Sequence, residues 1–454
     1  MLGEIIMGLK DQMKHEAGIG SLVERINLLK KLKGVIETYE DEIYDALKKD
    51  LDKDYGESYL TEVQIVLNEI NFTVKNLKKW MRPKRVRATL GNFPSKNYIY
   101  RDVLGRVLIM APWNYPFNLT LMPLVGAISG GNAAVIKMSR KSPHTETIVR
   151  EIIEKTFVQG EVTIVPADSD FRDLMRGKFD LVFFTGSTSV GRDIMAEAAK
   201  TLTPVILELG GKSPCYINKT ADIKLAARRI AWGKLLNGGQ TCIAPDYVLV
   251  DEEVEPEFID ALSKEFNKNI AAMGKDKGLV KVINEEAFDR IVSYINGNSS
   301  LIGGGYDRDG LSIEPTIIRN VTFDSPVMKE EIFGPVIPVI CVKDRAEAET
   351  FIKELPTPLA LYIFSSNLQE AKAMMKRLRF GGGCINDVVM HIANHNLPFG
   401  GVGESGIGCY HGKDNFNAFT RKKSVVISSV LFDFPFRYFP YDNRKINFLK
   451  KLLF

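Results

Sequence analysis

The chain has few cysteines and no long apolar segment. Only five cysteines occur in 454 residues, and their positions show no paired spacing. An odd number without a pattern argues against a disulfide framework and favours a reduced, intracellular compartment. No apolar run approaches the roughly 18 residues of a membrane span. The first ten residues contain Glu4 and no long apolar core, unlike a signal peptide. We therefore expect a cytoplasmic protein.

The chain also lacks a strong excess of charge. Its net charge is +4, and the lysines are interspersed with acidic residues instead of forming a basic stripe. This distribution argues against nucleic acid as a partner. A hydrophobic content of 45% with 26% charged residues is typical of a soluble globular protein. A chain of 454 residues is too long for one ordinary core, so we expect two or three domains.

From Gly105 onward, short apolar strands alternate with helices, which predicts parallel sheets covered on both faces. The break near Gly210-Gly211 divides this pattern into two units and is the expected hinge between domains. Ligands of such sheets bind beyond the carboxyl ends of the strands, so the loops there should carry the chemistry. Residues 21–50 and 57–81 are predicted to form surface helices without a chemical role. The expected strands are 106–111, 133–138, 162–166, 181–185 and 205–209 in the first unit, and 213–217, 247–250, 336–342, 359–365 and 383–386 in the second.

Residues 82–101 differ in character from their surroundings. Basic and apolar residues alternate there, which predicts an extended arm or hairpin. The segment is either a solvated edge or a strand that pairs with another subunit. We favour pairing, because an isolated hairpin is rarely stable without a partner.

Polar groups follow the first two predicted strands. Asn114 lies between two prolines in a loop, where an asparagine is usually a turn residue. At the carboxyl end of a strand, an oxyanion donor is the better interpretation. Lys137 and Arg140 follow the second strand and suit sugar hydroxyls or phosphate, although a solvated basic turn would look the same.

The fourth predicted strand leads to a hydroxyl-rich turn, and the fifth carries a carboxylate near its end. Gly186 and Ser187 belong to a strand-to-helix turn that favours a phosphate site, with a helix cap as the alternative. Glu208 lies among apolar residues just before Gly210, where burial without a partner would be costly. It is either an outward-facing residue on an edge strand or a general base with a raised pKa.

Cys242 differs from the other cysteines. Cys215, Cys341 and Cys384 lie in predicted strands, where cysteine behaves as a small buried hydrophobe. Cys242 instead follows the turn Gly238-Gly239, outside any apolar run and near the end of a helix. Such a turn can expose the sulfur to a cleft, so Cys242 is the candidate nucleophile.

Two further patterns resemble ligand sites only by their letters. Residues 401–406 match the glycine pattern of a dinucleotide loop, but too little chain follows for a βαβ unit. His391 and His395 have the spacing of a zinc helix, but Ile392 stands where a metalloprotease needs glutamate. We expect no metal site.

Six stretches in order give the chain a resemblance to the aldehyde dehydrogenase superfamily over nearly its whole length. The chain length and the segments Asn386-Asp387 and 410–413 resemble the class 3 or fatty-aldehyde branch, whose members are commonly dimers. The six stretches are Pro112-Trp113-Asn114, Phe184-Thr185-Gly186-Ser187, Leu207-Glu208-Leu209-Gly210-Gly211-Lys212, Gly239-Gln240-Thr241-Cys242, Glu331-Ile332-Phe333-Gly334-Pro335 and Leu397-Pro398-Phe399-Gly400-Gly401.

The resemblance implies a fold and a mechanism. It implies two Rossmann-like parallel-sheet domains with a β-strand oligomerisation arm. Cys242 would attack the aldehyde carbonyl, and Asn114 with the backbone N–H of Cys242 would hold the oxyanion. Hydride transfer would leave a thioester, which water activated by Glu208 would hydrolyse. Tyr115 would line the aldehyde tunnel.

The resemblance also implies the residues that bind NAD or NADP. Lys137 would hold the adenine ribose, and Glu331 would hold the nicotinamide ribose. The full set is Lys137, Arg140, Gly186, Ser187, Glu331, Phe333 and Trp113.

Arg140 departs from the family pattern. Members that use NAD generally carry glutamate at this position, three residues after the lysine. A cation there can pair with a 2′-phosphate, so we expect NADP use equal to or better than NAD.

The expected domain boundaries follow from these segments. Residues 1–81 and 102–209 would form the NAD(P)-binding domain, and residues 210–410 the catalytic domain. The arm would comprise 82–101 and 411–435. The aromatic and basic tail, 436–454, is either a strap across a dimer or, ranked second, a weak membrane-surface helix.

The leading functional hypothesis is oxidation of a medium- or long-chain aliphatic or aromatic aldehyde to its acid. An acylating or reductive relative is an alternative, but such relatives generally lack the glutamate found here as Glu208. A non-catalytic structural protein on this scaffold is a third class, disfavoured by the intact Cys242, Asn114 and Glu331. Which aldehyde is used cannot be read from the sequence.

Overall fold

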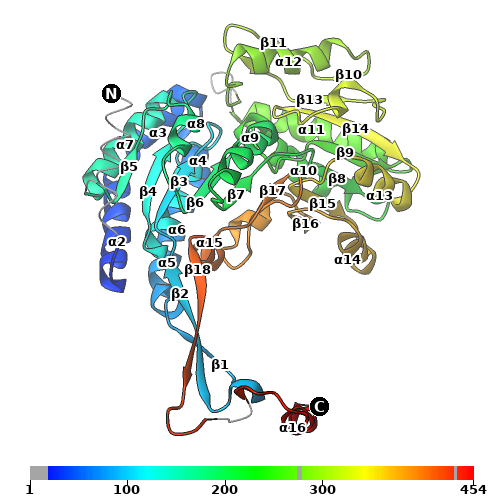
Figure 1. The fold of residues 1–454 in the computed structure, drawn as a ribbon. Coiled ribbons are helices and arrows are strands. Elements are labelled where there is room, and N and C mark those ends of the chain that lie inside the picture. The colour runs from blue at the N-terminus through cyan, green and yellow to red at the C-terminus, as the bar shows by residue number, and fades with distance from the viewer. Residues whose placement is uncertain (1–18, 159, 274–278, 434–436, 454) are drawn as a thin grey trace.

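The computed structural model describes residues 19–158, 160–273, 279–433 and 437–453. Two α/β bodies lie side by side, and a narrow β-arm projects away from them (Figure 1). The first ten residues, on which the signal-peptide prediction rests, lie outside the described residues. Among the residues that are described, no helix has the length and apolar character needed to cross a bilayer.

The first sheet contains the five strands expected of the first unit, each to within two residues at either end. All five run parallel, and a short sixth strand, β17 (Gly406–Ile407), pairs antiparallel with the last of them. This added strand covers an edge that would otherwise be open. In sheet order the strands are β17, β7 (Val205–Glu208), β6 (Leu181–Thr185), β3 (Arg106–Met110), β4 (Ala133–Lys137) and β5 (Val162–Ile164).

Helices cover both faces of the first sheet. One of them, α6 (Asn118–Gly130), is buried around its whole circumference, because α2 (Leu22–Thr38) and α5 (Gln64–Trp80) pack over it. The prediction of one helix over 21–50 was wrong. The chain leaves helical geometry at Tyr39 and starts again as α3 (Glu40–Leu51). The remaining helices of this body are α4 (Tyr55–Ser58), the π-helical turn η2 (Tyr59–Val63), α7 (Pro143–Thr156), α8 (Phe171–Met175) and α9 (Thr188–Ala199).

The second sheet has seven strands, five of which were expected. Two short strands that precede and follow a glycine-rich stretch were missed, because they lack the apolar length of the others. In sheet order the strands are β10 (Leu301–Ile302), β13 (Thr316–Ile318), β14 (Val336–Val342), β9 (Tyr247–Asp251), β8 (Pro214–Ile217), β15 (Ala360–Phe364) and β16 (Gly382–Ile385). The accompanying helices are α10 (Ile223–Leu235), α11 (Glu255–Met273), α12 (Glu285–Asn296), α13 (Arg345–Glu354) and α14 (Leu368–Arg377), of which α12 was not expected.

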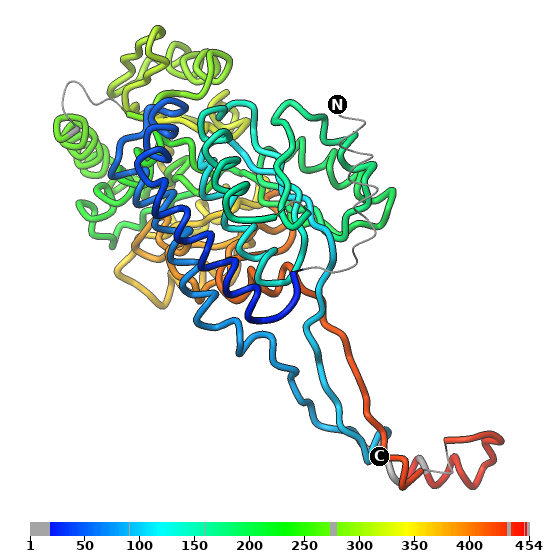
Figure 2. The backbone as a smooth tube through the Cα atoms, turned by 90° about the vertical axis from the view of Figure 1, so that its left-hand side faces the viewer, coloured from blue at the N-terminus to red at the C-terminus, as the bar shows by residue number. Residues whose placement is uncertain are grey.

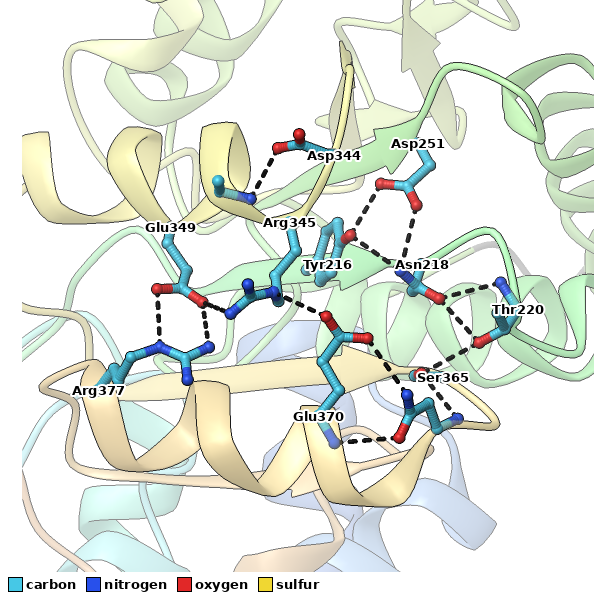
Figure 3. Close-up of polar contacts among 12 residues, drawn as sticks. Tyr216, Asn218, Thr220, Asp251, Asp344, Arg345, Glu349, Ser365, Glu370 and Arg377 are labelled. Carbon is cyan, nitrogen blue, oxygen red and sulfur yellow. Dashed lines mark hydrogen bonds and ion pairs between the residues drawn. The ribbon is translucent and has the colours of Figure 1, made fainter.

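A polar network occupies the carboxyl edge of the second sheet (Figure 3). The Tyr216 hydroxyl at the end of β8 donates to Asp251 at the end of β9, at 2.8 Å. Between α13 and α14, Glu349 accepts from Arg345 at 2.8 Å and from Arg377 at 2.6 Å. Polar side chains therefore bond to one another at the ends of β8 and β9 and between α13 and α14.

The arm is a three-stranded antiparallel sheet of β1 (Lys84–Val86), β2 (Ser95–Val103) and β18 (Thr420–Ser428). Strands β2 and β18 pair along their whole length, from Val103 with Thr420 to Ser95 with Ser428. The side view shows this ribbon leaving the body and ending near α16 (Asn443–Leu453) (Figure 2). Helix α15 (Gly412–Ala418) packs on α5 and α6, so the returning arm strand begins only after it.

Candidate active site

Cys242 lies just after a left-handed turn at the end of α10. A short 3₁₀ segment, η4 (Leu236–Gly239), contains Asn237 with φ 55° and Gly238 with φ 59°. A Cβ on Gly239 would lie 2.3 Å from the carbonyl oxygen of Gly334, so only glycine fits there. The turn directs Cys242 away from the helix, and its side chain stays partly exposed.

Asn114 reaches this turn from the other body. It follows β3 and is only 4% exposed. Its side-chain amide donates to the Gln240 carbonyl at 3.0 Å. In return, the Asn237 amide donates to the Asn114 carbonyl at 2.8 Å and to the Gln240 carbonyl at 3.1 Å. The two loops are thus joined by reciprocal hydrogen bonds two residues from Cys242.

Tyr115 belongs to the same contact. Its ring is buried, and its hydroxyl lies 2.5 Å from the Thr241 hydroxyl oxygen. Thr241 directly precedes Cys242, so Tyr115 borders the cysteine through one intervening residue. Thr241 lies in the stretch Gly239-Gln240-Thr241-Cys242, but the sequence predicts no role for it or for Asn237, because their contacts join loops more than 100 residues apart.

Glu208 is buried at the end of β7. It pairs with Gly406 of β17, is 3% exposed, and neither carboxylate oxygen has a hydrogen-bond partner among the described residues. Burial raises the pKa of Glu208 well above its usual range. The outward-facing alternative is therefore wrong, since β17 covers the edge on which it depended.

The charges around Cys242 oppose its ionisation. Partial burial raises the pKa of the Cys242 thiol, and the nearby carboxylates of Glu331 and Glu208 raise it further. The backbone N–H groups of Cys242 and Ile243 act in the opposite direction, because they donate toward the sulfur. The resting group is therefore a thiol, and its deprotonation requires a base or an added positive charge.

Glu331 lies against Gly210 and Gly211, where the sequence predicts a hinge. A Cβ on Gly210 would lie 2.0 Å from a Glu331 carboxylate oxygen, so the close approach depends on glycine. Burial, followed by the charge of Asp246, raises the pKa of Glu331 to about 8, although the Gly211 N–H and the cation of Lys212 oppose the shift. This carboxylate, Glu208 and Cys242 therefore share one electrostatic environment at the hinge.

Two aromatic rings close the space between the bodies. Trp113 and Phe333 meet edge to face, with ring centroids 5.6 Å apart. Phe333 has a φ of 53°, a left-handed conformation that is costly for a large side chain and that clusters at functional sites.

The cations after β4 line a cavity of about 290 Å³. The Lys137 ammonium donates to the Ala167 carbonyl at 3.0 Å. Burial, followed by the charge of Arg140, lowers the pKa of Lys137. Trp113 and Asp168 line the same cavity, so an acid faces the two cations. The cavity is large enough for a nucleoside and has the donors that hold sugar hydroxyls or phosphate.

Gly186 and Ser187 have local bonding roles. The Ser187 side chain caps α9 by accepting from the Val190 N–H at 3.5 Å. The Gly186 N–H donates to the Glu208 carbonyl at 3.0 Å. These bonds agree with the helix-cap interpretation of the turn. What the turn still presents to a ligand is the N-terminus of α9, whose first residues are largely exposed.

The two rejected patterns have other environments. Residues 401–406 form a tight turn that leads into β17 rather than into a helix. The His395 Nδ1 lies 3.0 Å from Glu69, whereas the His391 Nδ1 lies 3.8 Å from the Cys384 sulfur. The two histidines thus have different neighbours. Over the described ranges, no group of three His, Cys, Asp or Glu side chains is arranged to hold a metal.

The site lies between unlike edges of the two sheets. Asn114, Lys137 and Glu208 are at or beyond the carboxyl ends of β3, β4 and β7. Cys242 and Glu331 instead precede β9 and β14, at the amino edge of the second sheet. The candidate residues thus lie at the carboxyl edge of the first sheet, where the loops after the strands were expected to carry the chemistry, and at the amino edge of the second.

Comparison with known proteins agrees with this geometry. The model of the aldehyde dehydrogenase family matches residues 14–425. The 4,4'-diaponeurosporen-aldehyde dehydrogenase of Staphylococcus aureus is 44% identical over 407 residues, covering 88% of each chain. The dimeric NADP-preferring aldehyde dehydrogenase of Rattus norvegicus is 42% identical over 415 residues, covering 90% of this chain and 91% of its own.

A solved structure extends the similarity to three dimensions. Staphylococcus aureus AldH in its substrate-bound state superposes with a TM-score of 0.92 at 40% identity, covering 97% of this chain and 96% of its own. Several further relatives are named as members of aldehyde dehydrogenase family 3, in agreement with the class 3 resemblance. The protein is therefore a member of the aldehyde dehydrogenase family and an oxidoreductase that acts on aldehydes.

Proposed function

We propose that this protein oxidises a medium- or long-chain aliphatic or aromatic aldehyde to its carboxylic acid through a thioester on Cys242. The observation that carries the proposal is the convergence at the hinge of an accessible cysteine, the Asn114 amide and the buried, unpaired carboxylate of Glu208. The choice of an aldehyde substrate is supported by the relative named 4,4'-diaponeurosporen-aldehyde dehydrogenase. Tyr115 would line the path to the sulfur.

The first step is addition of the Cys242 sulfur to the aldehyde carbon. The developing oxyanion would be held by the Cys242 N–H and the Asn114 amide. One N–H of that amide is engaged by the Gln240 carbonyl, which leaves the second N–H for the substrate oxygen. When NAD(P) is bound, it supplies the hydride acceptor, and Cys242 is left as a thioester.

Glu208 would perform the second step by activating the water that hydrolyses the thioester. A carboxylate with a raised pKa accepts a proton readily near neutral pH, which is what a general base requires. Its position also argues against an acylating or reductive relative, because such enzymes transfer or reduce the acyl group without activating water. The same buried, unpaired carboxylate disfavours a purely structural role.

A rapid-mixing experiment separates the two steps. Glu208→Gln should release about one equivalent of reduced cofactor per site in a burst, then turn over roughly 100-fold or more below the wild-type rate, because only deacylation is blocked. Cys242→Ala should show neither burst nor turnover. Reduced-cofactor absorbance reports both. A Cys242→Ala enzyme with wild-type turnover would remove the cysteine from the mechanism.

The residues around the cavity after β4 fit a dinucleotide. Lys137 would hold the adenine ribose, with Trp113 on the cavity wall. The N-terminus of α9, at Gly186 and Ser187, would face the pyrophosphate. Glu331 and Phe333 would hold the nicotinamide ribose and ring. We infer that Arg140 pairs with a 2′-phosphate and favours NADP, as in the rat relative named NADP-preferring.

Charge reversal at Arg140 tests the cofactor preference. Arg140→Glu should lower the ratio of kcat/KM for NADP to that for NAD by about ten-fold or more, because a charge-assisted hydrogen bond is replaced by repulsion. Asp168→Asn removes the opposing acid from the same cavity and should shift the ratio toward NADP. Measuring a panel of aliphatic and aromatic aldehydes with each cofactor checks the substrate class as well. An unchanged ratio in Arg140→Glu would contradict the assignment.

We also propose the domain roles and a homodimer. Residues 1–81 and 102–209 would bind NAD(P), residues 210–410 would carry the nucleophile, and residues 82–101 and 411–435 would form the oligomerisation arm. Strand β18 lies at the edge of the arm sheet and exposes about half of the Val426 and Ile427 side chains. An exposed apolar edge strand is a template for pairing, and the rat relative is dimeric by name. Five free cysteines support a cytoplasmic location.

Lysines on the arm should break the dimer. Val426→Lys combined with Ile427→Lys should shift the sedimentation mass from twice the 50.9 kDa chain mass to one chain mass, because charge at the contact opposes pairing. Val158→Lys provides the control, since Val158 is at least as exposed as Val426 and Ile427 but lies on the body. A double-lysine variant that stays dimeric would place the subunit contact elsewhere.

For the tail, residues 436–454, we rank a strap across the dimer first and an anionic lipid surface second. Helix α16 contains Arg444, Lys445, Lys450 and Lys451 and no acidic residue, which supports the second candidate. Residues 436 and 454 of this segment lie outside the described residues. Co-sedimentation with phosphatidylserine vesicles should then be lost at high salt and in a chain ending at Tyr441. Equal binding by the shortened chain would dismiss lipid contact.

A further inference from the structure

A buried ion pair lies behind the Asn114 loop, in the N-terminal segment to which the sequence assigned no chemical role. Lys53 lies between α3 and α4, and Glu62 lies in the π-helical turn η2. Their side chains are completely buried, with Nζ 2.8 Å from Oε1. Two opposite charges in such a place must be matched by further hydrogen bonds. Those bonds go to the loop that carries Asn114.

The pair holds both ends of this loop. At one end, the Lys53 ammonium donates to the Asn114 carbonyl at 3.4 Å and lies 4.3 Å from the centroid of the Tyr115 ring. At the other end, the second Glu62 oxygen accepts from the Asn118 N–H at 2.8 Å. The Asn118 amide then returns a hydrogen bond to the Thr61 carbonyl at 3.1 Å. Each charged partner thus forms a hydrogen bond with a backbone group of residues 114–118.

The cysteine turn is held from the same side. The Asn114 carbonyl that accepts from Lys53 also accepts from the Asn237 amide, so both of its lone pairs are engaged. The Asn237 N–H donates to Glu57, in α4 next to the ion pair, at 2.5 Å. The N-terminal segment therefore contacts the two loops that would supply the oxyanion donor and the nucleophile.

We propose that the Lys53–Glu62 ion pair is a positioning device that orients the Asn114 amide toward the aldehyde oxygen. The inference rests on the proposed role of Asn114 as oxyanion donor. Two donors hold the Asn114 carbonyl, and Glu62 holds the following turn at Asn118. The Gln240 carbonyl holds the side-chain amide, so the direction of the amide depends on the position of this backbone. An oxyanion donor stabilises the transition state only when it is fixed at hydrogen-bond distance before the reaction. An apolar pair would fill the same space but would leave the Asn118 N–H without an acceptor.

Neutral replacement of the whole pair tests the role. Lys53→Met/Glu62→Gln keeps the volume and an acceptor for Asn118, but removes both charges and the donor to Asn114. We expect kcat with saturating aldehyde and cofactor to fall about ten-fold or more, while the Kd for NADP, measured by fluorescence titration, stays unchanged. Glu62→Gln alone is the milder second variant and should lower kcat in the same direction by less, should the double variant fail to fold.

Two comparisons separate positioning from general stability. Glu69 is an equally buried glutamate on α5 whose partners are Gly412, Asn415 and His395. Glu69→Gln should lower the thermal unfolding temperature while leaving kcat near wild type. In an Asn114→Ala background, removing the ion pair should cause no further loss of kcat, because it acts through Asn114.

The outcomes are distinct. The inference would be overturned if removing the pair lowered kcat equally in the wild-type and Asn114→Ala backgrounds. It would also be overturned if kcat were unchanged in both Glu62→Gln and the double variant. A wild-type enzyme without aldehyde oxidation, or full activity in Asn114→Ala, would instead defeat the proposed function. Loss of kcat only where Asn114 is present, with NADP binding intact, supports the positioning role.

Discussion

The hydrogen bonds between the Asn114 loop and the Cys242 turn are the contact on which the site depends. The Asn114 amide donates to the Gln240 carbonyl, and Asn237 donates back to the Asn114 carbonyl. Each loop comes from a different α/β body, so neither body alone contains the candidate site. Asn237 bridges both loops because it adopts a left-handed conformation, which asparagine tolerates better than most residues. The contact between the two bodies therefore holds the Asn114 amide near the Cys242 turn.

The second constraint is electrostatic. Glu208 and Glu331 are carboxylates in an environment that opposes charge, and both raise the pKa of Cys242. Burial without full pairing is unfavourable for stability, so these groups are found where chemistry requires them. Glycines at two positions allow the close packing of this region. Gly210 lets Glu331 approach the hinge, and Gly239 lets the cysteine turn pack against the Gly334 carbonyl.

The two sheets contribute unequally to the site. The first sheet presents its carboxyl edge and the second its amino edge. Near the opposite edge of the second sheet, Tyr216 bonds to Asp251 (Figure 3). The first sheet supplies the cations of the cofactor cavity and the candidate base. The second supplies the candidate nucleophile, Cys242, and Glu331. A loop from each then closes the cleft, where Trp113 meets Phe333.

The sequence by itself determined the parallel sheets, the arm and the family. Apolar strands of five or more residues leave a signal in the local pattern, and Asn114, Glu208 and Cys242 lie in short motifs that can be read directly. Only the tertiary structure decided which edge of each sheet lies near Cys242, that β17 pairs with β7 at Glu208, and that Lys53, Glu62 and Asn237 bond to the Asn114 loop. Those contacts join segments far apart in the chain. The type of a charged residue also does not reveal whether its side chain is buried or exposed. Such partners leave no periodic pattern in the sequence, because they become neighbours only when the chain has folded.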